Sequence, residues 1–234
     1  MTIGVFDSGI GGLTVLRELI KKYPNKYIYF GDCKNAPYGD KSINELKALT
    51  NKSINFLLSK KVDMIIIACG TISSNLYEYI KNKYNIPIID ILTPTVRYIK
   101  ENNINNLALL ATSKTIESGY FQSNIKNIKT LKCPKLVPMI ENSIIDENII
   151  KEYVQKVDGY NVIMGCTHFP IIEKIFKKYS TSSFINMGKC LTNYLNVNKG
   201  KLDITIYLSK VNDSISNSIN SIIDEKKKVV CIDA

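Results

Sequence analysis

The sequence has no long apolar run and only one histidine. No stretch of 18 or more apolar residues occurs among the 234 residues, so we expect no membrane-spanning helix. The chain opens on a strand-like segment and not on a basic region followed by an apolar core, so we also expect no signal peptide. These absences predict a cytoplasmic protein with no membrane partner.

Cysteines are few and lack the spacing of a metal or redox motif. The six cysteines are too sparse for a disulfide framework in a chain of this length. None forms a Cys-x-x-Cys pair, and the single histidine leaves few ligands for a structural zinc ion. We therefore expect reduced thiols and no metal.

Acidic residues are fewer than basic ones. The chain has 21 Asp and Glu against 31 Lys and Arg, a formal net charge of +10. Such an excess raises the hypothesis of nucleic-acid binding. The lysines are scattered along helix-like segments, and only residues 226–228 form a run. We therefore favour a solvated, lysine-rich surface and keep a basic binding protein as the alternative.

Strand-like and helix-like segments alternate along the chain. The apolar patterns predict strands at 3–6, 27–30, 64–68, 86–89, 107–111, 136–138, 162–164 and 184–186. They predict helices at 13–22, 43–59, 73–83, 94–102, 116–124, 146–154 and 171–178, with one more amphipathic helix in the C-terminal segment. This alternation predicts an α/β fold of mainly parallel sheets flanked by helices.

Two apolar runs, residues 64–71 and 161–168, look like copies of one another, and each carries a cysteine near its end. Cys69 is followed 21 residues later by Asp90, and Cys166 is followed 20 residues later by Asn186. The repeat predicts two pseudo-symmetric α/β domains, residues 1–93 plus 205–234 and residues 94–204. We expect the active site in the cleft between them.

The two repeated cysteines are candidate acid/base groups. Polar residues follow several predicted strands, and in parallel sheets ligands bind where strands end and helices begin. A buried apolar role is the common one for an isolated cysteine, but matching positions in two repeats favour a paired function. Two opposed thiols can remove a proton from one face of a carbon and return it to the other. Four cysteines lack this symmetry and are expected to be structural: Cys33, Cys133, Cys190 and Cys231.

Asp7 and His168 are the other candidates that the residues themselves suggest. Asp7 precedes a glycine-rich turn at 8–12, whose glycines allow close backbone approach but which lacks the lysine of a phosphate-binding loop. The ordinary alternative for Asp7 or Ser8 is a helix N-cap. His168 follows Cys166 by two residues, which favours a role in holding its proton over a place in a loop or the core.

Ordered motifs over nearly the whole chain resemble the glutamate racemases, the cofactor-independent branch of the aspartate/glutamate racemase superfamily. The motifs that carry the resemblance are residues 4–15, 31–32, 37–39, 68–71, 111–115, 133–141 and 165–170. The resemblance implies an isomerase with no cofactor and an acidic amino acid as ligand. It also implies a supply of D-glutamate for peptidoglycan, hence for the cell wall and cell shape. The oligomeric state stays open, with a homodimer as one alternative.

The resemblance also implies roles for individual residues. Cys69 and Cys166 would be the acid/base thiols, with Asp7 assisting the first and with Glu141 and His168 assisting the second. Sequence pattern alone would leave Glu141 as a solvated loop carboxylate. The implied substrate-binding residues are Ser8, Tyr38, Gly39, Gly70, Thr71, Thr112, Thr115 and Thr167.

Two positions depart from the family pattern. Gly70 stands where the family usually has an asparagine that binds the amino-acid head group, and Asn186 stands where it often has an aspartate. The change at Gly70 leaves aspartate or another amino acid open as the substrate.

Overall fold

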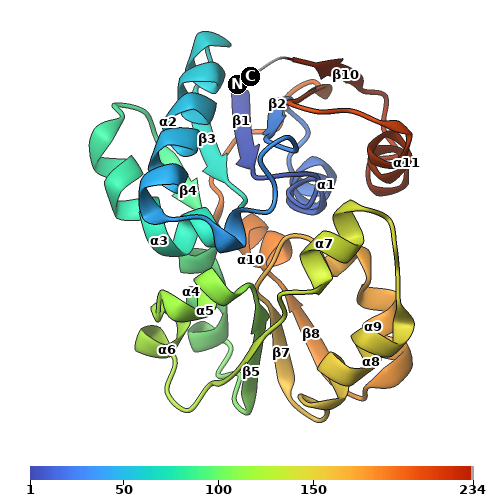
Figure 1. Cartoon of the computed structure of the whole chain (residues 1–234). Helices are drawn as coiled ribbons and strands as arrows, with labels where there is room; N and C mark the ends of the chain where they lie inside the picture. The colour runs from blue at the N-terminus through green and yellow to red at the C-terminus, as the bar shows by residue number, and fades with distance from the viewer. Residues whose placement is uncertain (233–234) are drawn as a thin grey trace.

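The computed structural model describes residues 1–232, which form two parallel β-sheets with helices packed on both faces of each (Figure 1). The first sheet has the order β10-β9-β2-β1-β3-β4. Its strands are β1 (Thr2–Asp7), β2 (Lys26–Gly31), β3 (Met64–Ile67), β4 (Ile88–Asp90), β9 (Asp203–Leu208) and β10 (Lys228–Cys231). The second sheet has the order β6-β5-β7-β8. Its strands are β5 (Leu107–Ala111), β6 (Lys129–Lys132), β7 (Asn161–Met164) and β8 (Ser183–Asn186). The predicted α/β fold class is confirmed.

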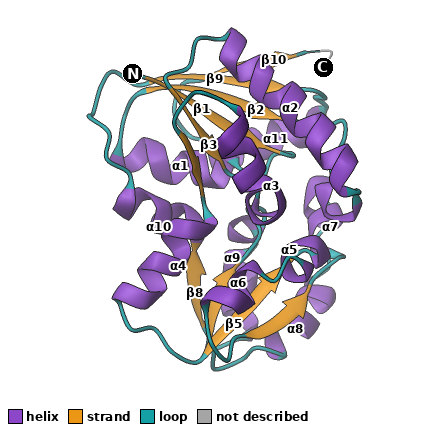
Figure 2. Ribbon diagram, turned by 90° about the vertical axis from the view of Figure 1, so that its left-hand side faces the viewer, coloured by secondary structure: helices purple, strands orange, loops and turns teal. Residues whose placement is uncertain are grey.

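The helices connect successive strands and cover the sheets (Figure 2). They are α1 (Leu13–Lys22), α2 (Ile43–Ser59), α3 (Gly70–Lys83), α4 (Leu92–Glu101), α5 (Ser113–Glu117), α6 (Tyr120–Asn124), α7 (Leu136–Glu141), α8 (Glu147–Gln155), α9 (Glu173–Tyr179), α10 (Met187–Tyr194) and α11 (Asp213–Ile222). Two 3-10 turns, η1 (Tyr38–Asp40) and η2 (Phe169–Ile171), lie near strand ends. As predicted, the C-terminal segment returns to the first sheet, where β9 pairs with β2.

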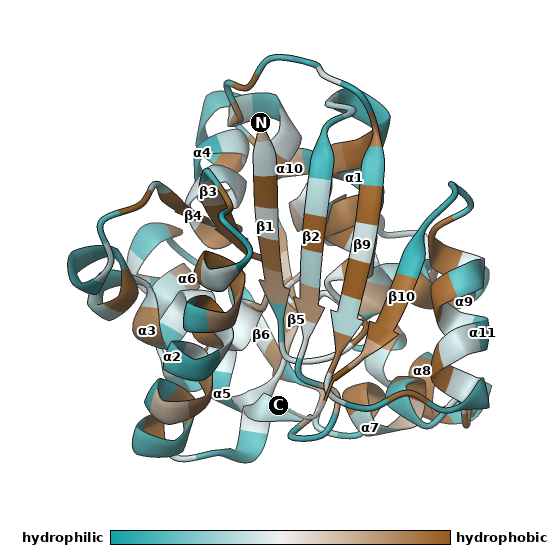
Figure 3. Ribbon diagram, turned by 90° about the horizontal axis from the view of Figure 1, so that it is seen from above, coloured by the Kyte–Doolittle hydropathy of each residue, from teal (hydrophilic) through white to brown (hydrophobic). Residues whose placement is uncertain are grey.

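Burial on both faces explains why the strands are apolar runs. Ile3 and Val5 of β1 point into one core cluster, which includes α1 and α11, while Phe6 points into another, which includes α2 and α3. A strand covered on both sides has no solvent face and therefore no polar alternation. Figure 3 shows this pattern in β1, which is mostly brown and lies beside β2 in the sheet.

One core cluster crosses from the first sheet to the second. Leu107, Leu109 and Ile163 of the second sheet share it with Ile3 and Val5 of the first. Contacts between α10 and α1 add to the same junction. The two sheets therefore share apolar packing, and the division into two domains stays a prediction.

The predicted strand at 136–138 is wrong. These residues begin helix α7, in which Leu136, Val137, Met139 and Ile140 are buried at helical spacing. The strand of this region is β6 (Lys129–Lys132), whose two lysines are exposed at the edge of the sheet. An edge strand of this kind has little apolar signal, and the proline of α7 fits the first turn of a helix.

Two other expectations need correction. The helix expected at 116–124 is broken into α5 and α6 at Gly119, which adopts a positive φ of 69°. The sequence patterns also did not predict helix α10 (Met187–Tyr194).

In residues 1–232, no helix has the length and apolar character needed to cross a bilayer.

The shared cluster predicts that the two sheets unfold together. Leu109→Ala should lower the free energy of unfolding by about 2–5 kcal/mol, because the fully buried side chain leaves a cavity. Urea titration followed by far-UV circular dichroism and tyrosine fluorescence should show one coincident transition in both proteins. Two separate transitions in the wild-type protein would contradict this shared core.

Candidate active site

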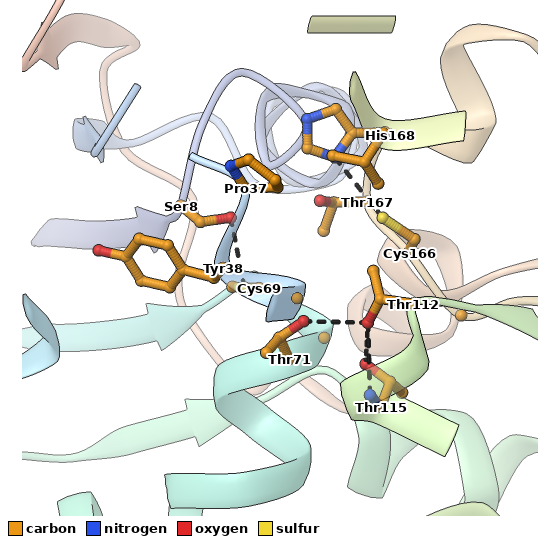
Figure 4. A pocket seen from close by; sticks show the side chains of 14 residues that line it. Ser8, Pro37, Tyr38, Cys69, Thr71, Thr112, Thr115, Cys166, Thr167 and His168 are labelled. Carbon is orange, nitrogen blue, oxygen red and sulfur yellow. Dashed lines mark hydrogen bonds between the residues drawn. The ribbon is translucent and has the colours of Figure 1, made fainter. Parts of the chain in front are cut away.

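A cavity lies where the carboxyl ends of strands from both sheets meet. Ser8 follows β1, Cys69 follows β3, Thr112 follows β5 and Cys166 follows β7, and all four line it (Figure 4). The cavity encloses about 300 Å³, including the part open to solvent.

The structure brings together in this cavity most of the residues predicted from the sequence. Both repeated cysteines and His168 line it. In Figure 4, Cys69 lies on one side of the space, and Cys166 and His168 lie on the other. The eight predicted substrate-binding residues also line it: Ser8, Tyr38, Gly39, Gly70, Thr71, Thr112, Thr115 and Thr167. Asp7 and Glu141 are not part of the lining. They lie behind it and are hydrogen-bonded to two lining residues, Thr167 and His168.

Cys69 lies at the start of helix α3, as its N-cap residue. Its side chain is buried, and its Sγ lies 3.5 Å from Ser8 Oγ. Burial raises the pKa of the Cys69 thiol to about 12, and the negative charge of Asp7 adds to this effect. Cys69 is therefore a protonated thiol at neutral pH.

Asp7 is fully buried at the end of β1. Its Oδ2 accepts hydrogen bonds from the N–H groups of Gly9 (3.2 Å) and Gly12 (2.9 Å), so it caps the glycine-rich turn. Its Oδ1 accepts a hydrogen bond of 3.4 Å from Thr167 Oγ1 of the second half. Burial raises the pKa of Asp7 to about 6, although the charge of His168 and the two N–H groups act against the rise.

Cys166, His168 and Glu141 form a chain of contacts. Cys166 Sγ lies 3.6 Å from His168 Nδ1, and His168 Nε2 lies 2.5 Å from Glu141 Oε1. Glu141 Oε1 also accepts a hydrogen bond of 3.2 Å from the backbone N–H of Ile10 in the first half. Cys166 is followed by the 3-10 turn η2 and not directly by a regular helix.

This chain of contacts favours a charged histidine. Burial disfavours the charged imidazole, but the hydrogen bonds with Cys166 and Glu141 and the charge of Glu141 outweigh it. The pKa of His168 is therefore raised well above its ordinary value. Burial also disfavours the carboxylate of Glu141, but the hydrogen bond and charge of His168 outweigh it and lower its pKa. A doubly protonated His168 donates to both neighbours.

The glycine-rich turn at 8–12 packs directly against Glu141 and His168. A Cβ atom at Gly9 would overlap the Glu141 carboxylate, and one at Gly11 would overlap the His168 ring. The close backbone approach that the glycines predicted therefore exists. The groups that approach are a carboxylate and an imidazole of the second half of the chain.

Hydroxyl groups line the side of the cavity between α3 and α5. Thr112 Oγ1 lies 3.1 Å from Thr71 Oγ1 and 3.0 Å from Thr115 Oγ1, a row visible in Figure 4. In residues 1–232, no lysine or arginine lines the cavity, and no group of three or more His, Cys, Asp or Glu is placed to hold a metal ion.

Comparison with known proteins decides the family. Residues 27–195 match the family model described as Asp/Glu/Hydantoin racemase. The chain belongs to this racemase family. The glutamate racemase of Hydrogenobaculum sp. (strain Y04AAS1) is 32% identical over 97% of this chain and 94% of its own length. That of Clostridium botulinum (strain Alaska E43 / Type E3) is 40% identical over 75% of this chain and 74% of its own.

A solved structure agrees with these relatives. The glutamate racemase of Francisella tularensis subsp. tularensis SCHU S4, in complex with D-glutamate, superposes with a TM-score of 0.83 at 29% identity. The match covers 99% of this chain and 97% of that one. The enzyme class is thus an amino-acid racemase.

Gly70 of this racemase lies against the loop that carries the second thiol. A Cβ atom at Gly70 would lie 2.8 Å from the carbonyl oxygen of Gly165, which is closer than real Cβ atoms come. Gly165 is itself closely packed, since a Cβ atom there would lie 2.5 Å from Leu109 Cδ1. The backbones that carry the two cysteines therefore touch where a side chain would separate them.

Sequence reasoning missed several residues of the racemase site. Pro37, Val137 and Gly165 also line the cavity, and all three lie within or beside the motifs that carry the family resemblance. Ile10 contributes only a backbone N–H, so no side-chain pattern signals its contact with Glu141.

The single histidine makes the His168–Glu141 pair directly measurable. We expect the ring of His168 to stay protonated at neutral pH in an NMR titration of untagged, ¹⁵N-histidine-labelled protein. Glu141→Gln should lower its pKa, since the carboxylate charge is removed.

The raised pKa of His168 determines whether the stability of the fold rises or falls with pH. A raised folded-state pKa stabilises the fold fully below the unfolded value of about 6.5, and this contribution is lost as pH rises through the folded pKa. Glu141→Gln should therefore weaken this dependence in unfolding experiments at several pH values. A His168 signal that titrates at its ordinary pKa would contradict the pairing.

Proposed function

We propose that this racemase interconverts L- and D-glutamate by proton transfer at Cα between two cysteines. The observation that carries the proposal is that Cys69 and Cys166, one from each repeat, lie on opposite sides of one small cavity (Figure 4). An enzyme that inverts a carbon centre with two bases needs such an arrangement. The glutamate named for the relatives supports this choice of substrate.

The proposed reaction moves one proton in and one proton out. Cys166, as thiolate, takes the α-proton of L-glutamate, and Cys69, as thiol, gives its proton to the opposite face of the same carbon. The C–H bond that breaks and the one that forms balance, and the two sulfur atoms exchange protonation states. Reaction of D-glutamate runs the same steps in reverse.

The contacts of each thiol support this starting state. His168 Nδ1 lies 3.6 Å from Cys166 Sγ, within reach for exchange of a proton with that sulfur. Cys69 is a thiol at neutral pH, because burial and the nearby Asp7 raise its pKa. Asp7 itself, with a pKa of about 6, changes charge close to neutral pH.

The α-proton of an amino acid is far less acidic than a thiol, so the site must stabilise carbanionic charge. Preorganised donors in a site that excludes water contribute roughly 3 kcal/mol each. The candidates are the hydroxyls of Thr71, Thr112 and Thr115 and the first N–H groups of helix α3. These donors also suit a substrate with two carboxylates. In a bacterium, the D-glutamate formed would supply peptidoglycan synthesis.

One observation favours a second candidate substrate. Gly70 has no side chain on the cavity wall, and this lets its backbone lie against the carbonyl of Gly165. The segments that carry the two thiols are therefore close together. Aspartate, one methylene shorter than glutamate, is therefore the alternative.

The two-thiol mechanism predicts the behaviour of three variants. In D₂O, the wild-type protein should introduce deuterium at Cα of either enantiomer as it converts it. Cys69→Ser and Cys166→Ser should each lower racemisation by about 10²- to 10⁴-fold, because each removes one proton-transfer group. Cys190→Ser, a core position outside the cavity, is the matched control and should retain activity. Full activity of Cys166→Ser would refute the mechanism.

A chiral assay on both acidic amino acids tests the substrate. We expect kcat/KM for glutamate to exceed that for aspartate roughly 10- to 200-fold, the usual effect of one methylene in a fitted site. Circular dichroism of the amino acid or chiral chromatography measures both reactions. A preference for aspartate would replace the proposed substrate and keep the two-thiol chemistry.

A further inference from the structure

We propose that Thr14 is a positioning residue that fixes the orientation of the Cys166-Thr167-His168 segment from across the cleft. Thr14 belongs to helix α1 of the first half and does not line the cavity. The inference rests on the proposed function, since it assigns to Thr14 a part in the proton transfer through Cys166.

The contact that carries the inference is a buried hydrogen bond between the two halves. Thr14 Oγ1 donates to the backbone carbonyl of Thr167 at 2.8 Å, and the Thr14 side chain is 1% exposed. Thr167 lies between the candidate base Cys166 and its partner His168. The acceptor is therefore the carbonyl oxygen of the peptide unit that links Thr167 to His168.

The hydroxyl of Thr14 is not used within its own helix. A threonine in a helix commonly donates to a carbonyl three or four residues earlier, as Thr95 in α4 does to Ile91 at 2.7 Å. Thr14 donates its backbone N–H to Gly11 at 3.0 Å, but its hydroxyl points to the other half of the chain. The helix thus presents a donor to the second thiol loop.

This hydrogen bond is one of a connected set that joins α1, Asp7 and Thr167. Thr167 Oγ1 donates to Asp7, Asp7 accepts from the N–H of Gly12, and Gly12 leads directly into the first turn of α1, which carries Thr14. The residue between Cys166 and His168 is therefore bound to the first half through both its side chain and its backbone.

Loss of the hydroxyl has a local consequence. A buried carbonyl without a partner is unfavourable, and the peptide would rotate to find another donor. Rotation of this peptide moves the His168 ring relative to Cys166 Sγ, whose separation is 3.6 Å. Small misplacement of a proton-transfer group lowers the rate while substrate binding is retained.

Thr14→Val is the test variant, because it keeps the shape of the side chain and removes the hydroxyl. We expect kcat to fall about 10- to 100-fold with KM unchanged. Thr14→Ser keeps the donor and should restore activity close to that of the wild type. Thr95→Val removes an equally buried hydroxyl that bonds within its own helix and does not line the cavity, so it should have wild-type kcat.

A spectroscopic readout separates positioning from general stability. The imidazole resonances of His168, the only histidine, should shift in Thr14→Val and coincide with those of the wild type in Thr14→Ser and Thr95→Val. Thermal unfolding of Thr14→Val and Thr95→Val should be similar, so that the difference in kcat cannot be assigned to loss of fold.

The outcomes are distinguishable. Wild-type kcat and an unshifted His168 signal in Thr14→Val would overturn the inference, and so would equal losses of kcat in Thr14→Val and Thr95→Val or no rescue by serine. A wild-type protein that racemises neither glutamate nor aspartate would instead overturn the proposed function. In that case an unshifted His168 signal in Thr14→Val would independently refute the positional role.

Discussion

The low exposure of the Glu141 carboxylate, whose side chain is 13% exposed, is the constraint on which the rest of the site depends. A carboxylate in this position needs partners, because a buried charge without them is strongly destabilising. It finds them in His168 of its own half and in the backbone N–H of Ile10 in the other half. The charge that holds His168 protonated is therefore itself held by the first half of the chain. Each half thus supplies a hydrogen-bond partner to a candidate acid/base group of the other, since Thr167 likewise donates to Asp7.

These contacts explain why the turn at 8–12 is rich in glycine. A run of glycines after a first strand resembles a phosphate-binding loop, in which backbone N–H groups face an anion. Here, the anions are side chains of the protein: Asp7 accepts from Gly9 and Gly12, and Glu141 accepts from Ile10. The same backbone property that suits a phosphate serves two internal carboxylates, and the absence of side chains at Gly9 and Gly11 lets the second half come close.

Strand ends and the cysteine repeat were predictable from the sequence because they depend on local pattern. Apolar runs mark strands buried on both faces, and parallel strands bring their ends to one edge, which gathered Ser8, Cys69, Thr112 and Cys166. Glu141 was found only through family resemblance, since its burial results from packing between distant segments. Thr14 carries no local signal either, and the edge strand β6 was missed because most of its side chains are polar.

The contact between Gly70 and Gly165 limits which substitutions position 70 can accept. Any side chain at position 70 would bring its Cβ against the carbonyl oxygen of Gly165, so a substitution there requires the backbone to shift. Such a shift would move the segment that follows β7 and carries Cys166, and with it the second thiol. The missing side chain at position 70 therefore sets how closely the two cysteine-bearing segments approach one another.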